Sequence, residues 1–145
     1  MAYDKVGWHS GAVDYPDNLP YENGGTHIGM FLTWLIDNDL ISNFHKEDSQ
    51  EGIDLVRSRV ITGRDFLFDY CDEQFGEEFV VPKVLKFVER YYNNKYLHDY
   101  NILLCNGLNV EYEVENTWDN YKKIAPIINK RYSRYLKYKK IFFWI

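Results

Sequence analysis

The sequence predicts a mainly α-helical protein folded as a single compact domain over residues 1–145. Three observations support this. The length of 145 residues is that of one ordinary domain, apolar side chains recur at intervals of three and four residues, and only one short stretch alternates with a period of two. We therefore expect five to seven helices, with at most a small strand or hairpin near residues 108–114 and the C-terminus.

The chain is expected to begin with an irregular N-terminal arm over residues 1–25, because proline and glycine punctuate it at Pro16, Pro20, Gly24 and Gly25. A helix should follow, with Thr26 as its N-cap. Its apolar residues lie at helical spacing, and neighbouring Met30 and Trp34 widen the apolar face, so this helix should be buried on most sides: Ile28, Phe31, Leu32, Leu35 and Ile36.

The middle of the chain predicts two consecutive helices with a break near Gly63, and then a helix that begins at Pro82. A further short helix should end at Asn106-Gly107. Residues 108–114 alternate between apolar and polar side chains, which is typical of a strand.

The last helix should begin at Thr117, as its N-cap, and Pro126 should kink or restart it. Residues 134–145 form a basic, aromatic C-terminal extension. Its last five residues are apolar or aromatic, so they could pair as an edge strand with residues 108–114.

Charge is distributed unevenly along the chain. The net charge is −5, yet residues 1–120 carry 22 acidic and 9 basic side chains, whereas residues 121–145 carry 8 basic and no acidic ones. An acidic body repels nucleic acid and attracts basic proteins. We expect the basic tail to fold back on the body and neutralise it; contact with phosphate or an anionic membrane is the alternative.

The two cysteines, Cys71 and Cys105, fit buried free thiols, and no CxxC motif points to zinc. No apolar run is long enough to span a membrane, and no signal-peptide pattern opens the chain. We therefore expect a cytoplasmic protein without cofactor, membrane partner or nucleic-acid partner.

The sharpest candidates for chemistry are His9 and His27, the latter at the start of the predicted helix after the arm. A histidine at a helix N-terminus tends to stay neutral, which suits a metal ligand or a general base. It equally suits a hydrogen bond that fastens the arm. A metal site needs a third ligand, and Asp14, Asp17 and Glu22 are nearby, although in the sequence only.

Clustered carboxylates give a second candidate site. They fit a solvated face, but they also fit a docking surface for a basic protein such as a nuclease, because carboxylates can occupy phosphate sites. The candidate contact residues are Asp37, Asp39, Glu47, Asp48, Glu51, Asp54, Asp72, Glu73, Glu77, Glu78, Glu111 and Glu113.

Four sequence blocks carry a family resemblance. They are Trp8-His9-Ser10-Gly11, Gly25-Thr26-His27-Ile28-Gly29-Met30-Phe31-Leu32-Thr33-Trp34, Phe66-Leu67-Phe68-Asp69-Tyr70-Cys71-Asp72 and Asn116-Thr117-Trp118-Asp119-Asn120-Tyr121. The chain resembles a family of small bacterial proteins of unknown function, which in turn resemble immunity proteins of contact-dependent and type VI toxin systems. The extension after Arg134 departs from the family's shorter end.

The resemblance and the acidic body together predict an immunity protein. It would not be an enzyme, and it would bind and neutralise a cognate basic toxin, most simply a nuclease, by covering the toxin's active site or a neighbouring exosite. The alternative is a small metal-binding protein or enzyme with a site around His9 and His27. The sequence indicates no oligomeric state.

Overall fold

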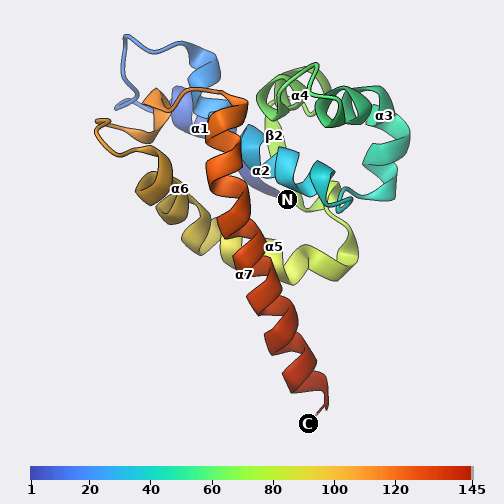
Figure 1. Ribbon diagram of the computed structural model, residues 1–145. Helices are drawn as coiled ribbons and strands as arrows, with labels where there is room; N and C mark the ends of the chain where they lie inside the picture. The colour runs from blue at the N-terminus through green and yellow to red at the C-terminus, as the bar shows by residue number, and fades with distance from the viewer. Residues whose placement is uncertain (145) are drawn as a thin grey trace.

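The computed structural model describes the backbone of residues 1–144 and the side chains of residues 1–141. Helices dominate this part of the chain, as predicted, and they form one compact domain (Figure 1). The α-helices are α1 (Val6–Ser10), α2 (Thr26–Asp37), α3 (Asn43–Arg57), α4 (Gly63–Tyr70), α5 (Leu85–Tyr91), α6 (Leu97–Leu104) and α7 (Trp118–Trp144).

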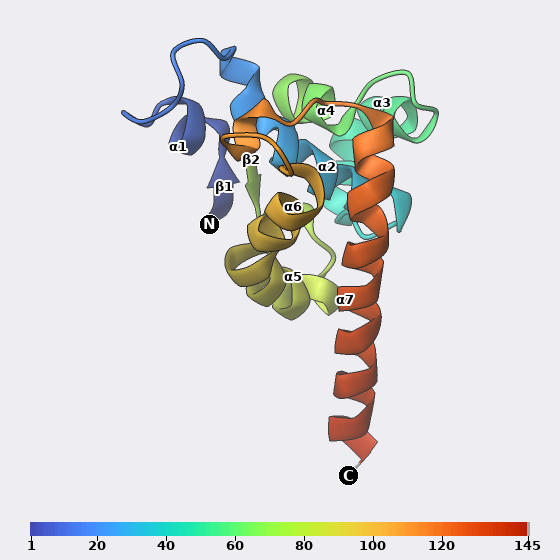
Figure 2. The ribbon, with the colours of Figure 1, turned by 60° about the vertical axis from the view of Figure 1, so that its left-hand side comes forward.

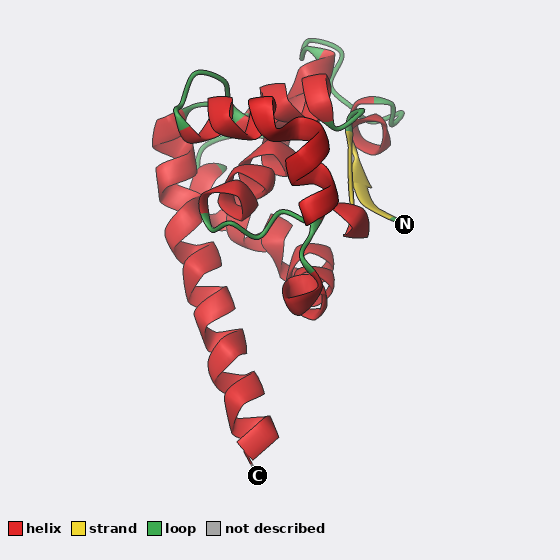
Figure 3. Cartoon of the chain, turned by 90° about the vertical axis from the view of Figure 1, so that its right-hand side faces the viewer, coloured by secondary structure: helices red, strands yellow, loops and turns green. Residues whose placement is uncertain are grey.

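The central element of the fold is α2, whose residues from Thr26 to Ile36 are all buried. Helices α3 and α4 lie on one side of it, and α5, α6 and α7 lie on the other (Figure 1). Figure 3 shows how little of the chain is strand. This arrangement follows from the sequence, because a helix that is apolar on nearly every side must be covered on nearly every side.

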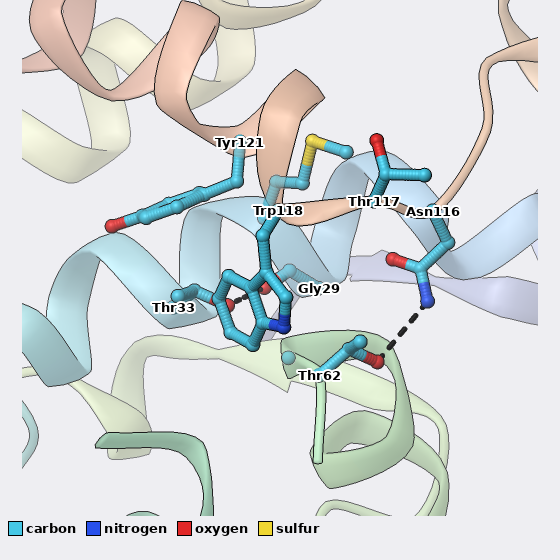
Figure 4. A pocket seen from close by; sticks show the side chains of 9 residues that line it. Gly29, Thr33, Thr62, Asn116, Thr117, Trp118 and Tyr121 are labelled. Carbon is cyan, nitrogen blue, oxygen red and sulfur yellow. Dashed lines mark hydrogen bonds between the residues drawn. The ribbon is translucent and has the colours of Figure 1, made fainter. Parts of the chain in front are cut away.

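Helices α2 and α4 approach each other through two glycines. A side chain at Gly63 would collide with the carbonyl oxygen of Gly29 and with the Thr33 hydroxyl. Trp118, at the start of α7, lies over this contact, and Asn116 Nδ2 donates to Thr62 Oγ1 at 3.1 Å beside it (Figure 4). The hollow between these side chains is about 10 Å³, room for no more than one water molecule.

Helix α7 continues through Pro126 as one helix, so it does not restart at this residue. Its first half packs on the body through Tyr121, Ile124 and Ile128. Its C-terminal end projects away from the body (Figures 1 and 2). None of the described helices is long and apolar enough to cross a membrane.

The sheet is small, as predicted, but its position was predicted wrongly. It pairs β1 (Ala2–Lys5) antiparallel to β2 (Gln74–Gly76). Residues 108–114 instead form a loop with a 3₁₀ turn at Glu111–Glu113, and residues up to Trp144 are helical. The alternation at 108–114 is not matched by alternating burial, because Leu108 is exposed and Val110 to Glu113 are all half-buried. Ile145, also predicted to lie in an edge strand, is outside the described residues.

The N-terminal arm is more regular than predicted, since it contains β1, α1 and a 3₁₀ turn at Tyr21–Gly25. Because this turn runs directly into α2, the N-cap is Gly25, and Thr26 is the first helical residue. The Thr26 hydroxyl accepts a hydrogen bond from Arg64 rather than capping the helix. Thr117 does cap α7, because its hydroxyl oxygen accepts a hydrogen bond from the backbone amide of Asn120.

Candidate functional site

The side chain of Asp4 lies at the centre of a buried polar cluster. Its Oδ1 accepts hydrogen bonds from His9 Nε2 at 2.7 Å and from the Lys5 amide at 2.9 Å. Its Oδ2 accepts from His27 Nε2 at 3.0 Å and from the Tyr92 hydroxyl at 2.6 Å. One carboxylate therefore joins residues that are up to 88 positions apart in the sequence.

Four separate elements bring these side chains together. Asp4 comes from β1, His9 from α1, His27 from the first turn of α2, and Tyr92 from a π-helical turn at Tyr92–Tyr96 that links α5 to α6. The extra residue in such a turn shifts the side chains that follow it, and π turns are frequent at functional sites. Here the same turn also directs the Tyr96 hydroxyl to the backbone carbonyl of His27, at 2.6 Å.

A fifth segment completes the cluster. The Tyr112 hydroxyl, in the loop between α6 and α7, lies 2.6 Å from His9 Nδ1. Both ring nitrogens of His9 therefore have partners, one on each side of the ring. The His9 and His27 rings meet edge to face, with centroids 4.5 Å apart.

The electrostatics favour an ionised carboxylate among neutral phenols. Burial opposes ionisation of Asp4, but the hydrogen bonds from His27 and His9 outweigh it and hold its pKa well below the usual range. Burial, with the nearby carboxylates Glu111 and Asp4, raises the pKa of Tyr112 well above its usual value. Tyr112 is therefore a neutral hydrogen-bonding group rather than an activated nucleophile.

The cluster faces a hollow of about 180 Å³. Its wall includes Asp4, His9 and His27 themselves, and Tyr3, Asn93 and Leu97 complete much of the rest. This volume accommodates several water molecules or a small ligand. Asp4 and His27 are buried and His9 is half-buried, and all three line the hollow.

Asp4, His9 and His27 can also act as ligands of one metal ion. Each offers one ligand atom, and these atoms lie within 4.8 Å of one another. Two imidazole nitrogens and a carboxylate oxygen are ligands that zinc takes at about 2.0–2.2 Å, which places two ligand atoms of one ion roughly 3–4 Å apart. The Tyr112 hydroxyl behind His9 and the Tyr92 hydroxyl behind Asp4 would orient these ligands.

His9 and His27 were singled out from the sequence, and the structure brings both of them to Asp4, a carboxylate that was not named there. Asp14, Asp17 and Glu22 are exposed and outside the cluster. Asp4 went unnoticed because it lies before the punctuated part of the arm and in no motif. Tyr92 and Tyr112 were equally hidden among 13 tyrosines.

The predicted acidic surface divides into several places. Glu47, Asp48, Glu51 and Asp54 are exposed on α3. Glu78 belongs with them, because its backbone carbonyl accepts from Ser42 at the N-cap of α3. Glu111 and Glu113 lie instead on the loop before α7, on the far side of the domain from α3 (Figure 1).

Several of the predicted carboxylates have partners within the chain. Asp37 pairs with Arg59, and Asp39 pairs with Lys46 and Arg57. Glu77 pairs with the N-terminal amine, and Glu113 accepts hydrogen bonds from the backbone amides of Asn109 and Val110. Asp72 and Glu73 form a turn with positive φ before β2.

Both cysteines are free, and burial raises the pKa of the Cys71 thiol far above its usual value, so it is inert as a nucleophile. The basic tail was predicted to fold back on the body and neutralise it. Among the described ion pairs, one joins the tail to the body, and its cation is Arg131. Arg131 contacts Asp99 through two hydrogen bonds, at 2.9 and 3.1 Å.

Comparison with known proteins identifies a family without assigning an activity. The family described as a domain of unknown function, DUF7832, matches residues 2–114. The chain belongs to this family. No curated protein and no solved structure matches the chain. The matched range contains every member of the Asp4 cluster and ends before α7.

Proposed function

We propose that this chain is a metal-binding protein that holds a divalent transition metal ion, zinc by the chemistry of its ligands, between Asp4, His9 and His27. The observation that carries the proposal is the convergence of two histidine Nε2 atoms on one ionised, buried carboxylate beside an accessible hollow. The ion would take the place of the two Nε2 protons that now lie between the rings and Asp4.

The chemistry of the surrounding groups supports this proposal. Three protein ligands leave a fourth position for water or a small ligand, and the hollow lies beside it. A fixed hydrogen-bonding group behind a histidine ligand commonly strengthens binding. The nearest alternative is that the same hydrogen bonds only fasten β1 and α1 to α2.

Cobalt provides the test, because Co²⁺ occupies zinc sites and its visible absorption reports coordination by nitrogen and oxygen. Titration of the wild-type protein with Co²⁺ should give a saturable spectrum with one ion per chain, and Zn²⁺ should displace it. His9→Gln and His27→Gln should each abolish the spectrum. His98→Gln is the matched control, since His98 is exposed and outside the cluster.

Folding failure and loss of a ligand can be told apart. Both cluster variants are compared with wild type by circular dichroism, and Tyr112→Phe, which keeps all three ligands, should retain the spectrum with weaker affinity. A wild-type protein that gives no cobalt spectrum and no displacement by Zn²⁺ would refute the metal site. The cluster would then be a fastening network.

A second candidate function is the predicted immunity function, and α3 carries the observation that favours it. Phe44 is 69% exposed and lies on the same helix as Glu47, Asp48 and Glu51. An exposed aromatic ring among carboxylates is typical of an anchor on a protein-binding surface. Its partner would be a basic toxin, which the acidic helix would attract.

The test of this second function is association with the basic protein encoded beside this chain's gene. Glu47→Lys with Asp48→Lys and Glu51→Lys should slow association about tenfold or more at low salt. Asp14→Lys with Asp17→Lys and Glu22→Lys is the control with the same change of charge. No complex, or equal slowing by both triple variants, would remove α3 as the binding surface.

A further inference from the structure

A basic groove lies between α5 and the middle of α7, away from the metal-ligand cluster. It consists of two adjoining hollows of about 550 and 420 Å³, which share Arg90, Tyr135 and Tyr138 in their walls. At one end of the groove α7 continues beyond the body (Figure 2). It is the largest concave surface among the described hollows.

Every charged side chain that lines the two hollows is a cation. One wall belongs to the segment from Pro82 to Lys95, and the other belongs to α7. The cations are Lys83, Lys86, Arg90, Lys95, Arg131, Arg134 and Lys139. Of these, Arg131 is engaged by Asp99. The groove therefore presents two facing rows of positive charge.

Aromatic rings lie between the two rows of cations. Phe87 and Tyr91 are stacked with centroids 5.4 Å apart, and Tyr135 lies 5.6 Å from Phe87. Tyr138 is 54% exposed at the open end. Phe87 and Tyr91 are buried, so the rings that can stack on another planar group are those of Tyr135, which is half-buried, and Tyr138.

The acidic part of the molecule lies elsewhere. The carboxylates of α3 are near the end of the domain opposite to the tip of α7 (Figure 1). The prediction of no nucleic-acid partner came from the charge of the body, and the structure separates that charge from the cations of α7. The wall that α7 supplies also lies outside the residues that the family shares.

We propose that this groove binds single-stranded nucleic acid, with its arginines and lysines contacting phosphates and Tyr135 stacking on a base. Cationic walls that follow a backbone, with aromatic rings between them for bases, are the arrangement that single-strand binding requires. An acidic peptide would use the cations equally well, but it would gain nothing from the rings. This inference is independent of the proposed metal site.

Fluorescence anisotropy with a labelled oligo-dT of about 12 nucleotides, within the site size of such grooves, tests the proposal. Binding should weaken steeply between about 50 and 200 mM salt, because each phosphate contact releases a counterion. Arg90→Glu with Arg134→Glu should weaken binding at least tenfold. Lys122→Glu with Lys123→Glu, on the same helix but outside the groove, should weaken it much less.

Tyr135→Leu separates stacking from charge, and it should weaken binding about tenfold without changing the salt dependence. The side chains changed in the two charge-reversal variants, Arg90, Arg134, Lys122 and Lys123, are all exposed. The melting curves of these variants should therefore match that of the wild type. Absence of binding at low salt would overturn the proposal. So would equal loss in the two charge-reversal variants, or displacement of oligo-dT by poly-glutamate at equal charge concentration.

Discussion

Two buried carboxylates, Asp4 and Asp99, have opposite kinds of partners. Asp99 receives two hydrogen bonds from the Arg131 guanidinium and one from the Tyr91 hydroxyl. Asp4 receives its side-chain hydrogen bonds from two imidazoles and a phenol. Each carboxyl group is buried, which opposes its ionisation, and each has its pKa lowered by its partners.

The two carboxylates differ in whether their partners can lose a proton. A guanidinium keeps its charge, so Asp99 and Arg131 form a completed ion pair that attaches α7 to α6. Imidazole nitrogens can instead give up a proton and bind a metal ion. Asp99 is therefore a structural connection, whereas the imidazole partners of Asp4 are groups of a kind that can also bind a cation.

The largest expected effect is on the structural carboxylate. Arg131→Met leaves Asp99 buried without a cation, so the free energy of unfolding should fall by about 3 kcal/mol. Chemical denaturation measures this. Arg134→Met, one turn further along α7, should change it by less than about 0.5 kcal/mol. Equal effects of the two variants would mean that the ion pair does not attach α7.

The stability of the Asp4 cluster should depend on an added metal ion and not on Arg131. Zn²⁺ at about 100 times its Kd should raise the free energy of unfolding of the wild type by about 2.7 kcal/mol. Arg131→Met should keep this increment, and His27→Gln should lose it. An increment that survives in His27→Gln would place the ion somewhere else.

The sequence predicted the helical class because the apolar spacing in α2 is a local property. It did not predict the β1–β2 pair, because strands of four and three residues that lie 69 positions apart in the chain carry too few side chains for a period to stand out. Pairing of β1 with β2 is what brings Asp4 to His27. The site therefore depends on a tertiary contact for which the sequence has no local signal.

The sequence did nevertheless indicate the two histidines of the site. His9 and His27 stand out because the chain has only 4 histidines. Their partner carboxylate did not stand out among 22 acidic residues. Asp4 and Asp14 are each five residues from His9, so distance along the chain does not separate them, whereas the fold places Asp4 against both histidines.

The group behind His9 should contribute less than the ligands themselves. Tyr112→Phe removes the hydroxyl next to His9 Nδ1, so unfolding should cost about 1 kcal/mol less. Zinc affinity should fall about tenfold, measured by competition with a chelating dye. Tyr15→Phe removes a hydroxyl that donates to the Pro20 carbonyl, so it should leave zinc affinity unchanged.

His45 provides a histidine without such a carboxylate partner. It stacks on Phe79 at 3.8 Å, and its buried Nδ1 has no hydrogen-bond partner among the described residues. Burial lowers its pKa, and the nearby charges of Glu78 and Asp48 only partly oppose this.

The unfolded chain therefore binds a proton at His45 more readily than the folded chain does. Stability should fall as the pH drops below the unfolded value of about 6.5. His45→Phe should flatten the dependence of unfolding free energy on pH in that range, and His98→Gln should not. An unchanged slope in His45→Phe would show that His45 does not contribute to it.

The most direct test of the metal site is to observe the two rings themselves. Long-range ¹⁵N–¹H correlation spectra of the histidine rings, recorded during a zinc titration, report each ring nitrogen separately. We predict that Nε2 of His9 and of His27 shift together and saturate at one Zn²⁺ per chain, while the rings of His45 and His98 do not change. Rings of His9 and His27 that keep their zinc-free spectrum at saturating Zn²⁺ would contradict the assignment of this cluster as a metal site.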